Sequence, residues 1–261
     1  MKNINFKSAS NTKEAIKLVS NKTTFLAGGM TLLPAIKLRL AAYSDLINIK
    51  KIKSLSGIKV SSKSLRIGAT TTHAEVAASK EVGKSISSLA ILAESIGDPQ
   101  VRNRGTIGGS IANNDPAADY PSACLALNAT IHTNKRKIPA NKFFKEMFET
   151  DLKKGELIES VEFEVPEKSA YAKFPNPASR YAIVGVYVAK LKNEVRVAVT
   201  GVESCVFRCK KLEDILSKNF SSSAIDDVNI SSKGFNTDIH ASAEYRAHII
   251  KVMAKKAISS C

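Results

Sequence analysis

The sequence predicts an α+β fold made of two domains, and three observations carry this prediction. Up to about residue 165, short apolar runs alternate with segments of helical periodicity, as in a mixed α and β domain. A proline-rich stretch follows, with Pro166, Pro175 and Pro177. Beyond it, two long β-rich runs and two helix-like segments indicate a second, smaller α+β domain. We therefore expect a first domain over residues 1–165 and a second over residues 166–261.

The elements of the first domain are predicted from apolar runs and from the residues that bound them. Pro34 falls in the first turn of its helix, where a missing N–H costs little. Thr72 and Glu75 have capping-box spacing, and Gly97 is suited to stop a helix. Asp119 precedes another helix as its N-cap. We expect a strand end and a short helix within residues 136–149. The other expected strands lie at residues 23–29, 45–49, 65–69, 129–133 and 156–166. The expected helices lie at residues 31–41, 71–79, 85–97 and 119–129.

The second domain is predicted to begin with a connection and to continue as a hairpin and two helices. Residues 166–179 contain three prolines and are expected to be a connecting segment. Residues 181–191 and 194–204 are β-rich runs that meet at the polar turn KNE, which indicates an antiparallel hairpin. Residues 211–220 and 242–258 have the pattern of helices.

The composition favours a globular protein that works in the cytoplasm. The chain has 261 residues, of which 44% are hydrophobic, and it contains no run of about 18 apolar residues that would span a membrane. Its first ten residues lack the apolar core of a secretory signal. Of the four cysteines, only Cys205 and Cys209 lie close together, and no His or Cys partners flank them in a metal-binding motif. We therefore expect no metal centre within this chain.

The formal net charge of +15 suggests an anionic partner, such as a nucleic acid, an acidic subunit or a phosphorylated ligand. The lysines are scattered along the chain, however, and no basic run is longer than residues 134–137 (NKRK). Aromatic residues are not interleaved with basic ones in the way that stacks bases. We expect a lysine-rich solvated surface and no nucleic-acid binding.

Residues 26–34 (LAGGMTLLP) place two glycines between a predicted strand and a predicted helix. Glycine lets backbone N–H groups approach an anion closely, and the N-terminus of a following helix adds its positive dipole end. Gly28 and Gly29 are therefore suited to a pyrophosphate. A glycine pair between a strand and a helix is also a common structural turn, so this pattern alone leaves both interpretations open.

A second glycine-rich segment, residues 104–119 (RGTIGGSIANNDPAAD), contains Gly105, Gly108 and Gly109. It matches neither the P-loop pattern nor the dinucleotide fingerprint GxGxxG. It offers a second set of backbone N–H groups and several side chains that can bond a neutral polar ligand. These side chains belong to Thr106, Ser110, Asn113, Asn114, Asp115 and Asp119. Two such segments, about 80 residues apart, suggest one long ligand held at two places.

Together the two segments resemble the FAD-binding medium subunit of the molybdenum hydroxylases, the family of carbon monoxide dehydrogenase and xanthine dehydrogenase. The resemblance rests on LAGGMTLLP and RNRGTIGGSIANNDPAADYP, with IGDPQV before the latter and GELIESVEF after it. It extends to RYAIVGVYVA, VRVAVTGV and AEYRAHII and so covers nearly the whole chain. It implies a vanillyl-alcohol-oxidase or PCMH-type FAD-binding domain of two α/β subdomains, followed by a small C-terminal α+β domain with an antiparallel three-stranded sheet.

The resemblance also implies which residues contact FAD. Met30 departs from the family, because many members have a polar Thr, Gln or His there, but backbone contacts survive this change. The four histidines, His73, His132, His240 and His248, are expected at surface or structural positions. The implied contacts are Phe25, Leu26, Ala27, Gly28, Gly29, Met30, Thr31 and Leu32 around the pyrophosphate and adenine, Thr106, Ile107, Gly108, Gly109 and Ser110 near the phosphates, Asn114 and Asp115 in the same segment, Asp119 at a flavin-chain hydroxyl, Ile158 at the ring system and Lys173 at the flavin.

The function implied by the resemblance is electron transfer within a complex. FAD accepts one or two electrons, so the protein holds and tunes it and needs no catalytic acid or base of its own. In the resembled family, electrons pass from a molybdopterin centre in a large subunit, through two [2Fe-2S] clusters in a small subunit, to this flavin. They then reach NAD, a quinone or oxygen. We therefore expect an oxidoreductase subunit that assembles with both partners as a dimer of heterotrimers.

Two other functions remain open. One is a free-standing FAD-dependent reductase of the same fold, of the enolpyruvyl-UDP-GlcNAc reductase type, which would need catalytic residues that the sequence does not show. The other is a non-catalytic basic binding module, whose affinity for a polyanion would fall steeply with salt. A member that reduces hydroxybenzoyl-CoA would carry an additional four-cysteine insertion, and the cysteine count argues against it.

Overall fold

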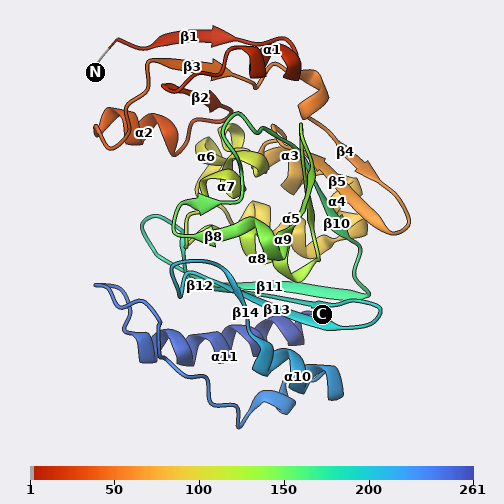
Figure 1. Cartoon of the computed structure of the whole chain (residues 1–261). Coiled ribbons are helices and arrows are strands. Elements are labelled where there is room, and N and C mark those ends of the chain that lie inside the picture. The colour runs from red at the N-terminus through yellow and green to blue at the C-terminus, as the bar shows by residue number, and fades with distance from the viewer. Residues whose placement is uncertain (1–2) are drawn as a thin grey trace.

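The computed structural model of the chain describes residues 3–261 and confirms the predicted α+β class (Figure 1). Its strands form a three-stranded, a five-stranded and a four-stranded sheet and a two-stranded hairpin. In Figure 1 these parts are stacked, with the N-terminal sheet at the top and the helices and the five-stranded sheet in the middle. The four-stranded sheet and its two helices lie at the bottom.

The N-terminal layer is a small parallel sheet with two crossover helices. Parallel neighbours cannot be joined by a tight turn, so each pair of consecutive strands here is joined through a helix. Its first helix is capped by Asn11, whose side chain accepts a hydrogen bond from the backbone N–H of Glu14. The strand order is β1 (Asn5–Ser8), β3 (Asp45–Asn48), β2 (Thr23–Leu26), and the helices are α1 (Thr12–Lys17) and α2 (Leu32–Lys37).

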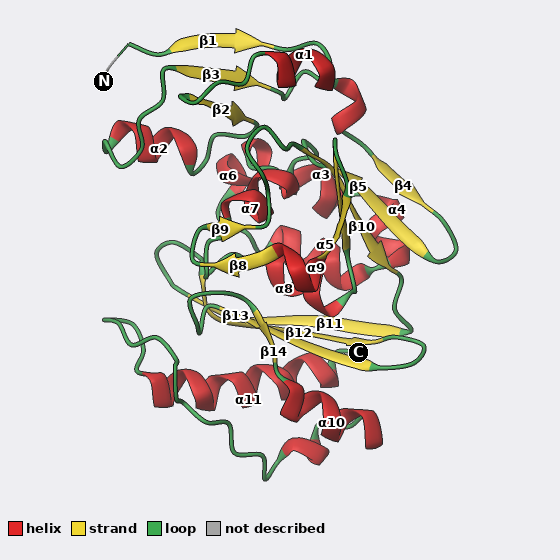
Figure 2. Ribbon diagram, viewed as in Figure 1, coloured by secondary structure: helices red, strands yellow, loops and turns green. Residues whose placement is uncertain are grey.

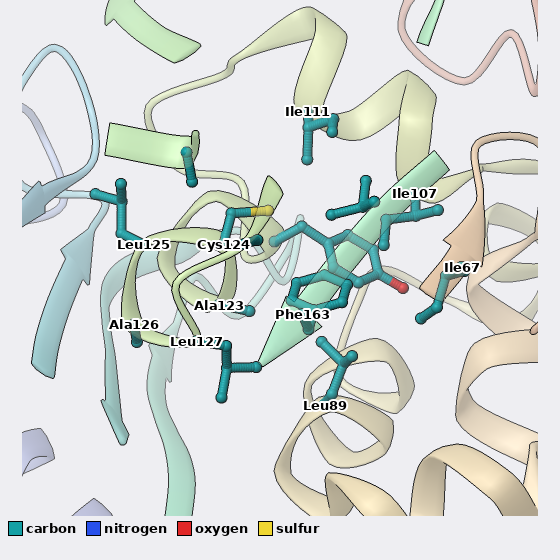
Figure 3. Close-up of a cluster of buried hydrophobic side chains, with 14 of the residues drawn as sticks. Ile67, Leu89, Ile107, Ile111, Ala123, Cys124, Leu125, Ala126, Leu127 and Phe163 are labelled. Atoms are coloured by element: carbon teal, nitrogen blue, oxygen red, sulfur yellow. The ribbon is translucent and has the colours of Figure 1, made fainter. Parts of the chain in front are cut away.

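The middle layer is an antiparallel sheet covered by short helices. Its order is β4 (Ile58–Val60), β5 (Ser64–Gly68), β10 (Ile158–Glu164), β6 (Thr130–Thr133), β7 (Lys137–Pro139). The helices are α3 (His73–Ala78), α4 (Lys80–Ser85), α5 (Ser87–Glu94), α6 (Pro99–Arg104), α7 (Ile107–Asn113), α8 (Tyr120–Ala126) and α9 (Ala140–Phe143), with the 3-10 turn η1 (Lys53–Leu55) before the sheet. The hairpin β8 (Phe144–Glu146) and β9 (Glu149–Thr150) follows α9. Figure 3 shows the core of this layer, where Ile67, Leu89 and Phe163 meet.

The predicted capping box is confirmed at the start of α3. The Thr72 hydroxyl accepts from the N–H of Glu75, while the Glu75 carboxylate accepts from the N–H of Thr72 at 2.7 Å. Helix α2 is shorter than expected, because Arg39 adopts a left-handed conformation with φ 63° just after it. Asp119 stands at the N-cap position of α8, but its side chain caps nothing.

Residues 166–179 are not a connection, so the expectation drawn from their prolines is wrong. Residues Lys168–Pro175 form strand β11, which pairs antiparallel with β12 (Ala182–Lys190) along its length. The prolines are compatible with a strand because Pro166 precedes it and Pro175 is its last residue, at a register shift. The hairpin of β12 and β13 (Val195–Thr200) is confirmed, and the short β14 (Phe207–Arg208) adds a fourth strand to the expected three.

Strand β12 is buried on both faces and belongs to two cores. Tyr187 and Ala189 pack into the core of the middle layer. Val184, Val186 and Val188 pack into a second core with α10 (Lys210–Lys218) and α11 (Ala243–Ser259), which is joined to α10 through the 3-10 turn η2 (Ser223–Ile225). A strand covered on both sides reads as an unbroken apolar run, which accounts for the sequence AIVGVYVA. The predicted domain boundary lies between β10 and β11 and stays a prediction.

A buried arginine fixes α11 to the outer face of this sheet. Arg246 Nη1 donates to the carbonyl oxygens of Ile183 and Gly201 at 2.6 and 2.7 Å, and Nη2 donates to Asp238 at 2.7 Å. Helix α11 spans 17 residues. Within residues 3–261, no helix combines the length and the apolar character needed to cross a lipid bilayer.

A buried hydroxyl network joins the middle layer to the C-terminal sheet. The Ser88 hydroxyl, in α5, lies 2.6 Å from the hydroxyl of Tyr187 and 2.6 Å from that of Ser169 in β11. Residues 95–98 connect α5 to α6. Because this connection begins at the end of α5, the network also helps to hold it in place.

Replacing Tyr187 with Phe tests this anchor. Tyr187→Phe removes a buried hydroxyl and leaves Ser88 with one partner fewer, so we expect the free energy of unfolding to fall by about 1 kcal/mol. Urea denaturation measures the change. Tyr245→Phe is the control, since Tyr245 is 43% exposed and its hydroxyl makes no hydrogen bond within the described chain. Equal effects of the two substitutions would contradict the anchoring role.

Candidate functional site

A cleft of ≈ 580 Å³ lies between the N-terminal layer and the helices of the middle layer. Both glycine-rich segments line it, together with the start of α3, the turn after α5 and the turn between β11 and β12. The structure thus brings two segments that are far apart in the sequence to one cleft. Of the residues predicted for the site, the cleft is lined by Phe25, Leu26, Ala27, Gly28, Gly29, Met30, Thr31, Leu32, Thr106, Gly108, Gly109, Ser110, Asp115, Asp119 and Ile158, whereas Ile107, Asn114 and Lys173 lie away from it.

The first glycine segment presents a run of unused backbone donors. The described chain offers no hydrogen-bond acceptor to the N–H groups of five successive residues, Gly28, Gly29, Met30, Thr31 and Leu32. Helix geometry is one reason. The first N–H groups of a helix have no carbonyl oxygen one turn earlier that could accept their hydrogen bonds, and α2 begins at Leu32. All five residues line the cleft, so this segment suits a phosphate group.

Direct contact between the two glycine-rich segments requires Gly28. A Cβ on Gly28 would lie 2.1 Å from the carbonyl oxygen of Arg104 and 2.8 Å from the Cα of Gly105. Backbone therefore packs on backbone here, with no room for a side chain. Gly29 has a different reason to be glycine, since its φ of 76° lies in the left-handed region.

The second glycine segment serves mainly as a wall of the cleft. A Cβ on Gly108 would lie 2.6 Å from the Cβ of Ala69, so this glycine lets α7 pack against the end of β5. The expected second set of free donors is not present, because the protein itself uses these N–H groups. They donate from Ile107 to Thr71 O, from Gly108 to Ala69 O, from Gly109 to Thr106 Oγ1 and from Ser110 to Thr106 O.

Asp119 is held at the cleft wall by two side chains of β11. Its Oδ1 accepts a hydrogen bond from the Tyr171 hydroxyl and lies 3.0 Å from Lys173 Nζ. Burial raises the pKa of Asp119, and the positive charge of Lys173 and the bond from Tyr171 oppose that rise. This geometry replaces the expected helix cap, because the carboxylate turns to β11 instead of to the N–H groups of α8.

Lys173 lies behind Asp119 and does not line the cleft. Besides Asp119, its Nζ donates to the carbonyl oxygens of Ser95 at 2.8 Å and Arg180 at 3.0 Å. Its three protons are therefore committed within the protein. Lys173 joins three parts of the cleft wall: α8, the turn after α5 and the turn between β11 and β12.

Two predicted residues are buried in the protein for other reasons. Ile107 is fully buried in the core of the middle layer. Asn114 is 1% exposed, and its Nδ2 donates to the carbonyl oxygens of Glu146 and Glu149 at 2.8 Å each. Its neighbour Asp115 does line the cleft, and burial raises the pKa of that carboxyl.

His73 is a cleft residue that the sequence reasoning missed. It was expected at a surface or structural position; it is buried, packs so closely on Gly105 that a Cβ there would meet its Nε2 at 2.6 Å, and also lines the cleft. Burial, with the charge of Arg102 as a second cause, lowers the pKa of His73 to about 4, so the ring is neutral at pH 7. Its Nδ1 is buried with no partner within the described chain. The position of His73 directly after the capping residue Thr72 does not indicate a contact with Gly105, which is about 30 residues later in the sequence.

The turn between β11 and β12 was also missed. Ser179, Arg180 and Tyr181 line the cleft, and Arg180 Nη1 donates to the carbonyl oxygen of Gly97 at 3.2 Å. Because the prolines suggested a plain connection, no site residue other than Lys173 was expected there.

A family model described as the FAD binding domain in molybdopterin dehydrogenase matches residues 2–167. The chain is 35% identical over 271 residues to the glyceraldehyde dehydrogenase medium chain of Sulfolobus acidocaldarius, with 95% of each chain covered. It is 32% identical over 268 residues to the carbon monoxide dehydrogenase medium chain of Hydrogenophaga pseudoflava, covering 95% of this chain and 93% of that one.

Solved structures agree with this similarity. A chain of the reconstituted CO dehydrogenase from Oligotropha carboxidovorans superposes with a TM-score of 0.90 at 25% sequence identity. The superposition covers 98% of this chain and 96% of that one, so it includes the C-terminal sheet and its helices as well as the cleft.

Lys173→Met tests the role of the lysine behind Asp119. It leaves a buried carboxylate without its cation, so we expect about 3–5 kcal/mol of destabilisation near pH 8. The pKa of Asp119 in the folded variant then rises further above its unfolded value. The loss should therefore shrink as the pH falls from 8 to 5, because protonation of Asp119 in the folded state removes the uncompensated charge. Denaturation at both pH values measures this. A loss independent of pH would assign Lys173 a packing role only.

Proposed function

The chain belongs to the FAD-binding family of the molybdopterin dehydrogenases, and from this premise we propose that it passes electrons between partner subunits and an external acceptor. At the coarser level it is an FAD-binding oxidoreductase subunit of the carbon monoxide and xanthine dehydrogenase type. FAD supplies the redox chemistry in such proteins, whereas the protein binds it, orients it and excludes competing reactions.

The single observation that carries the proposal is the run of unused N–H groups from Gly28 to Leu32 along the cleft. A pyrophosphate is the part of FAD that requires such donors, and the helix start at α2 adds its positive dipole end. The bare backbone at Gly28 and Gly29 allows close approach. We therefore propose that residues 25–32 hold the pyrophosphate side of FAD.

The other walls of the cleft suit the uncharged parts of the cofactor. Ile158 and the turn at residues 179–181 offer apolar and aromatic surface for a ring system. We propose that Asp119 accepts hydrogen bonds from hydroxyls of the flavin chain, since Lys173 and Tyr171 keep its carboxylate in place from behind. Thr106, Ser110 and Asp115 are proposed as further contacts.

We propose that the electrons come from [2Fe-2S] clusters of a small partner subunit and originate at a large molybdopterin subunit, in a cytoplasmic dimer of heterotrimers. Two relatives from Paenarthrobacter nicotinovorans support an assembly, since one is named as subunit alpha of a 6-hydroxypseudooxynicotine dehydrogenase complex and the other as the medium subunit of nicotine 6-hydroxylase. NAD, a quinone or oxygen is proposed as the acceptor. A free-standing reductase or a basic binding module would account less well for the comparisons, because the similarity to a dehydrogenase medium chain covers 95% of this chain.

Gly28→Ala tests the placement of FAD. The new Cβ would meet Arg104 O at 2.1 Å and force the two segments apart, so we expect at least about a tenfold loss of bound flavin. Flavin is measured by absorbance per protein after purification and by its release on heating. Gly83→Ala is the matched control, since nothing lies within 4 Å of its new Cβ. Normal flavin content in Gly28→Ala would refute the placement.

Isolation from the native host tests the complex. We expect the affinity-tagged chain to co-purify with a large and a small subunit, with iron and molybdenum present alongside flavin. Metal analysis and flavin absorbance on one sample measure this. Recovery of a yellow chain that reduces a substrate alone would favour the free-standing reductase, and a colourless chain whose partner is lost with salt would favour the binding module.

A further inference from the structure

The hairpin of β8 and β9 holds two apolar side chains out in solvent. Its tip, residues 146–149, has the sequence Glu-Met-Phe-Glu, with Met147 49% exposed and Phe148 58% exposed. We call these four residues the β8–β9 tip. In Figure 2 the hairpin lies between the N-terminal sheet above and the C-terminal sheet below.

Phe148 has an unfavourable backbone conformation as well as an exposed side chain. Its φ is 57°, in the left-handed region that glycine and asparagine adopt readily and bulky residues avoid. Burial of the ring does not compensate for this strain, because the ring is largely exposed. Asparagine or glycine at this position would give the isolated chain a higher free energy of unfolding.

A buried amide from the glycine-rich segment fixes the tip in this shape. Asn114 donates from Nδ2 to the backbone carbonyl oxygens of Glu146 and Glu149, and the backbone carbonyl oxygen of Asn114 accepts a hydrogen bond from the N–H of Phe148 at 3.1 Å. Asn113 and Asp115, on either side of Asn114, line the cleft. The tip is therefore rigid and is built on the wall of the cofactor cleft.

The charges of the tip indicate what it contacts. Glu146 and Glu149 flank the two apolar residues and are both exposed, on a chain whose net charge is +15. A second copy of this chain related by a two-fold axis that passes through the tip would bring two acidic tips together, which is unfavourable. The tip is complementary instead to an apolar pocket with a rim of Lys and Arg residues on a different chain.

We propose that the β8–β9 tip is a docking element for a partner subunit of the complex, with Phe148 as its anchor in an apolar, basic-rimmed pocket. This inference rests on the proposed function, since it assigns a contact surface to that assembly. A rigid, exposed aromatic residue is the type of side chain that carries a large share of binding energy at an interface. A partner bound there contacts a tip that is hydrogen-bonded to Asn114, whose neighbours Asn113 and Asp115 line the cleft.

The test uses Phe148→Asn in the tagged chain isolated from its native host. Asparagine suits the left-handed conformation, so we expect the thermal midpoint of the separately purified variant to be equal to or higher than that of the wild type. Its flavin content should be unchanged. Iron and molybdenum per flavin should fall about tenfold or more, as for the loss of an interface anchor. Phe148→Tyr should keep both metals.

Phe6→Asn is the matched control, because Phe6 is 61% exposed on β1 in the N-terminal layer. It should leave the metal content per flavin unchanged. Wild-type metal content in Phe148→Asn would overturn the inference, as would equal losses in Phe6→Asn. A wild-type chain that carries flavin but no iron or molybdenum would refute the proposed complex itself, which separates the two failures.

Discussion

The contact of bare backbone at Gly28 with the backbone of Arg104 and Gly105 is the constraint on which the cleft depends. It joins the N-terminal layer to the helices of the middle layer at a distance that excludes even a methyl group. The N–H groups that follow Gly28 are left without protein partners because the chain turns there into α2. One close contact thus sets both the width of the cleft and the position of its donors.

The two glycine-rich segments have different physical roles, although they look alike in sequence. The first leaves its donors unused and so can bind an anion. The second uses its N–H groups on Thr71, Ala69 and Thr106, and its glycines allow α7 to approach β5. The C-terminal sheet contributes as well, since Lys173 and Tyr171 position Asp119 from β11. All three layers are therefore needed to build one site.

The sequence predicted the features that depend on local chemistry. The capping box at Thr72, the hairpin of β12 and β13 and the glycine turn after β2 all follow from neighbouring residues. It failed where a distant partner decides the outcome. Lys168–Pro175 form a strand because β12 offers a long edge, and the carboxylate of Asp119 turns to β11 because Tyr171 and Lys173 are there. His73 lies at the cleft and packs against Gly105, a contact that no local sequence pattern reveals.

The central place of β10 has a consequence for how the chain is made. It lies between β5 and β6, and the bond from Arg66 to Ser160 joins residues 94 positions apart. During synthesis the hairpins β4–β5 and β6–β7 can form early. The edges of β5 and β6 that later pair with β10 stay unpaired until β10 has left the ribosome. Contacts of such long range form slowly, and unpaired edges invite pairing with other chains. The nascent protein therefore has two unpaired sheet edges that are open to aggregation in the interval before residue 164 emerges.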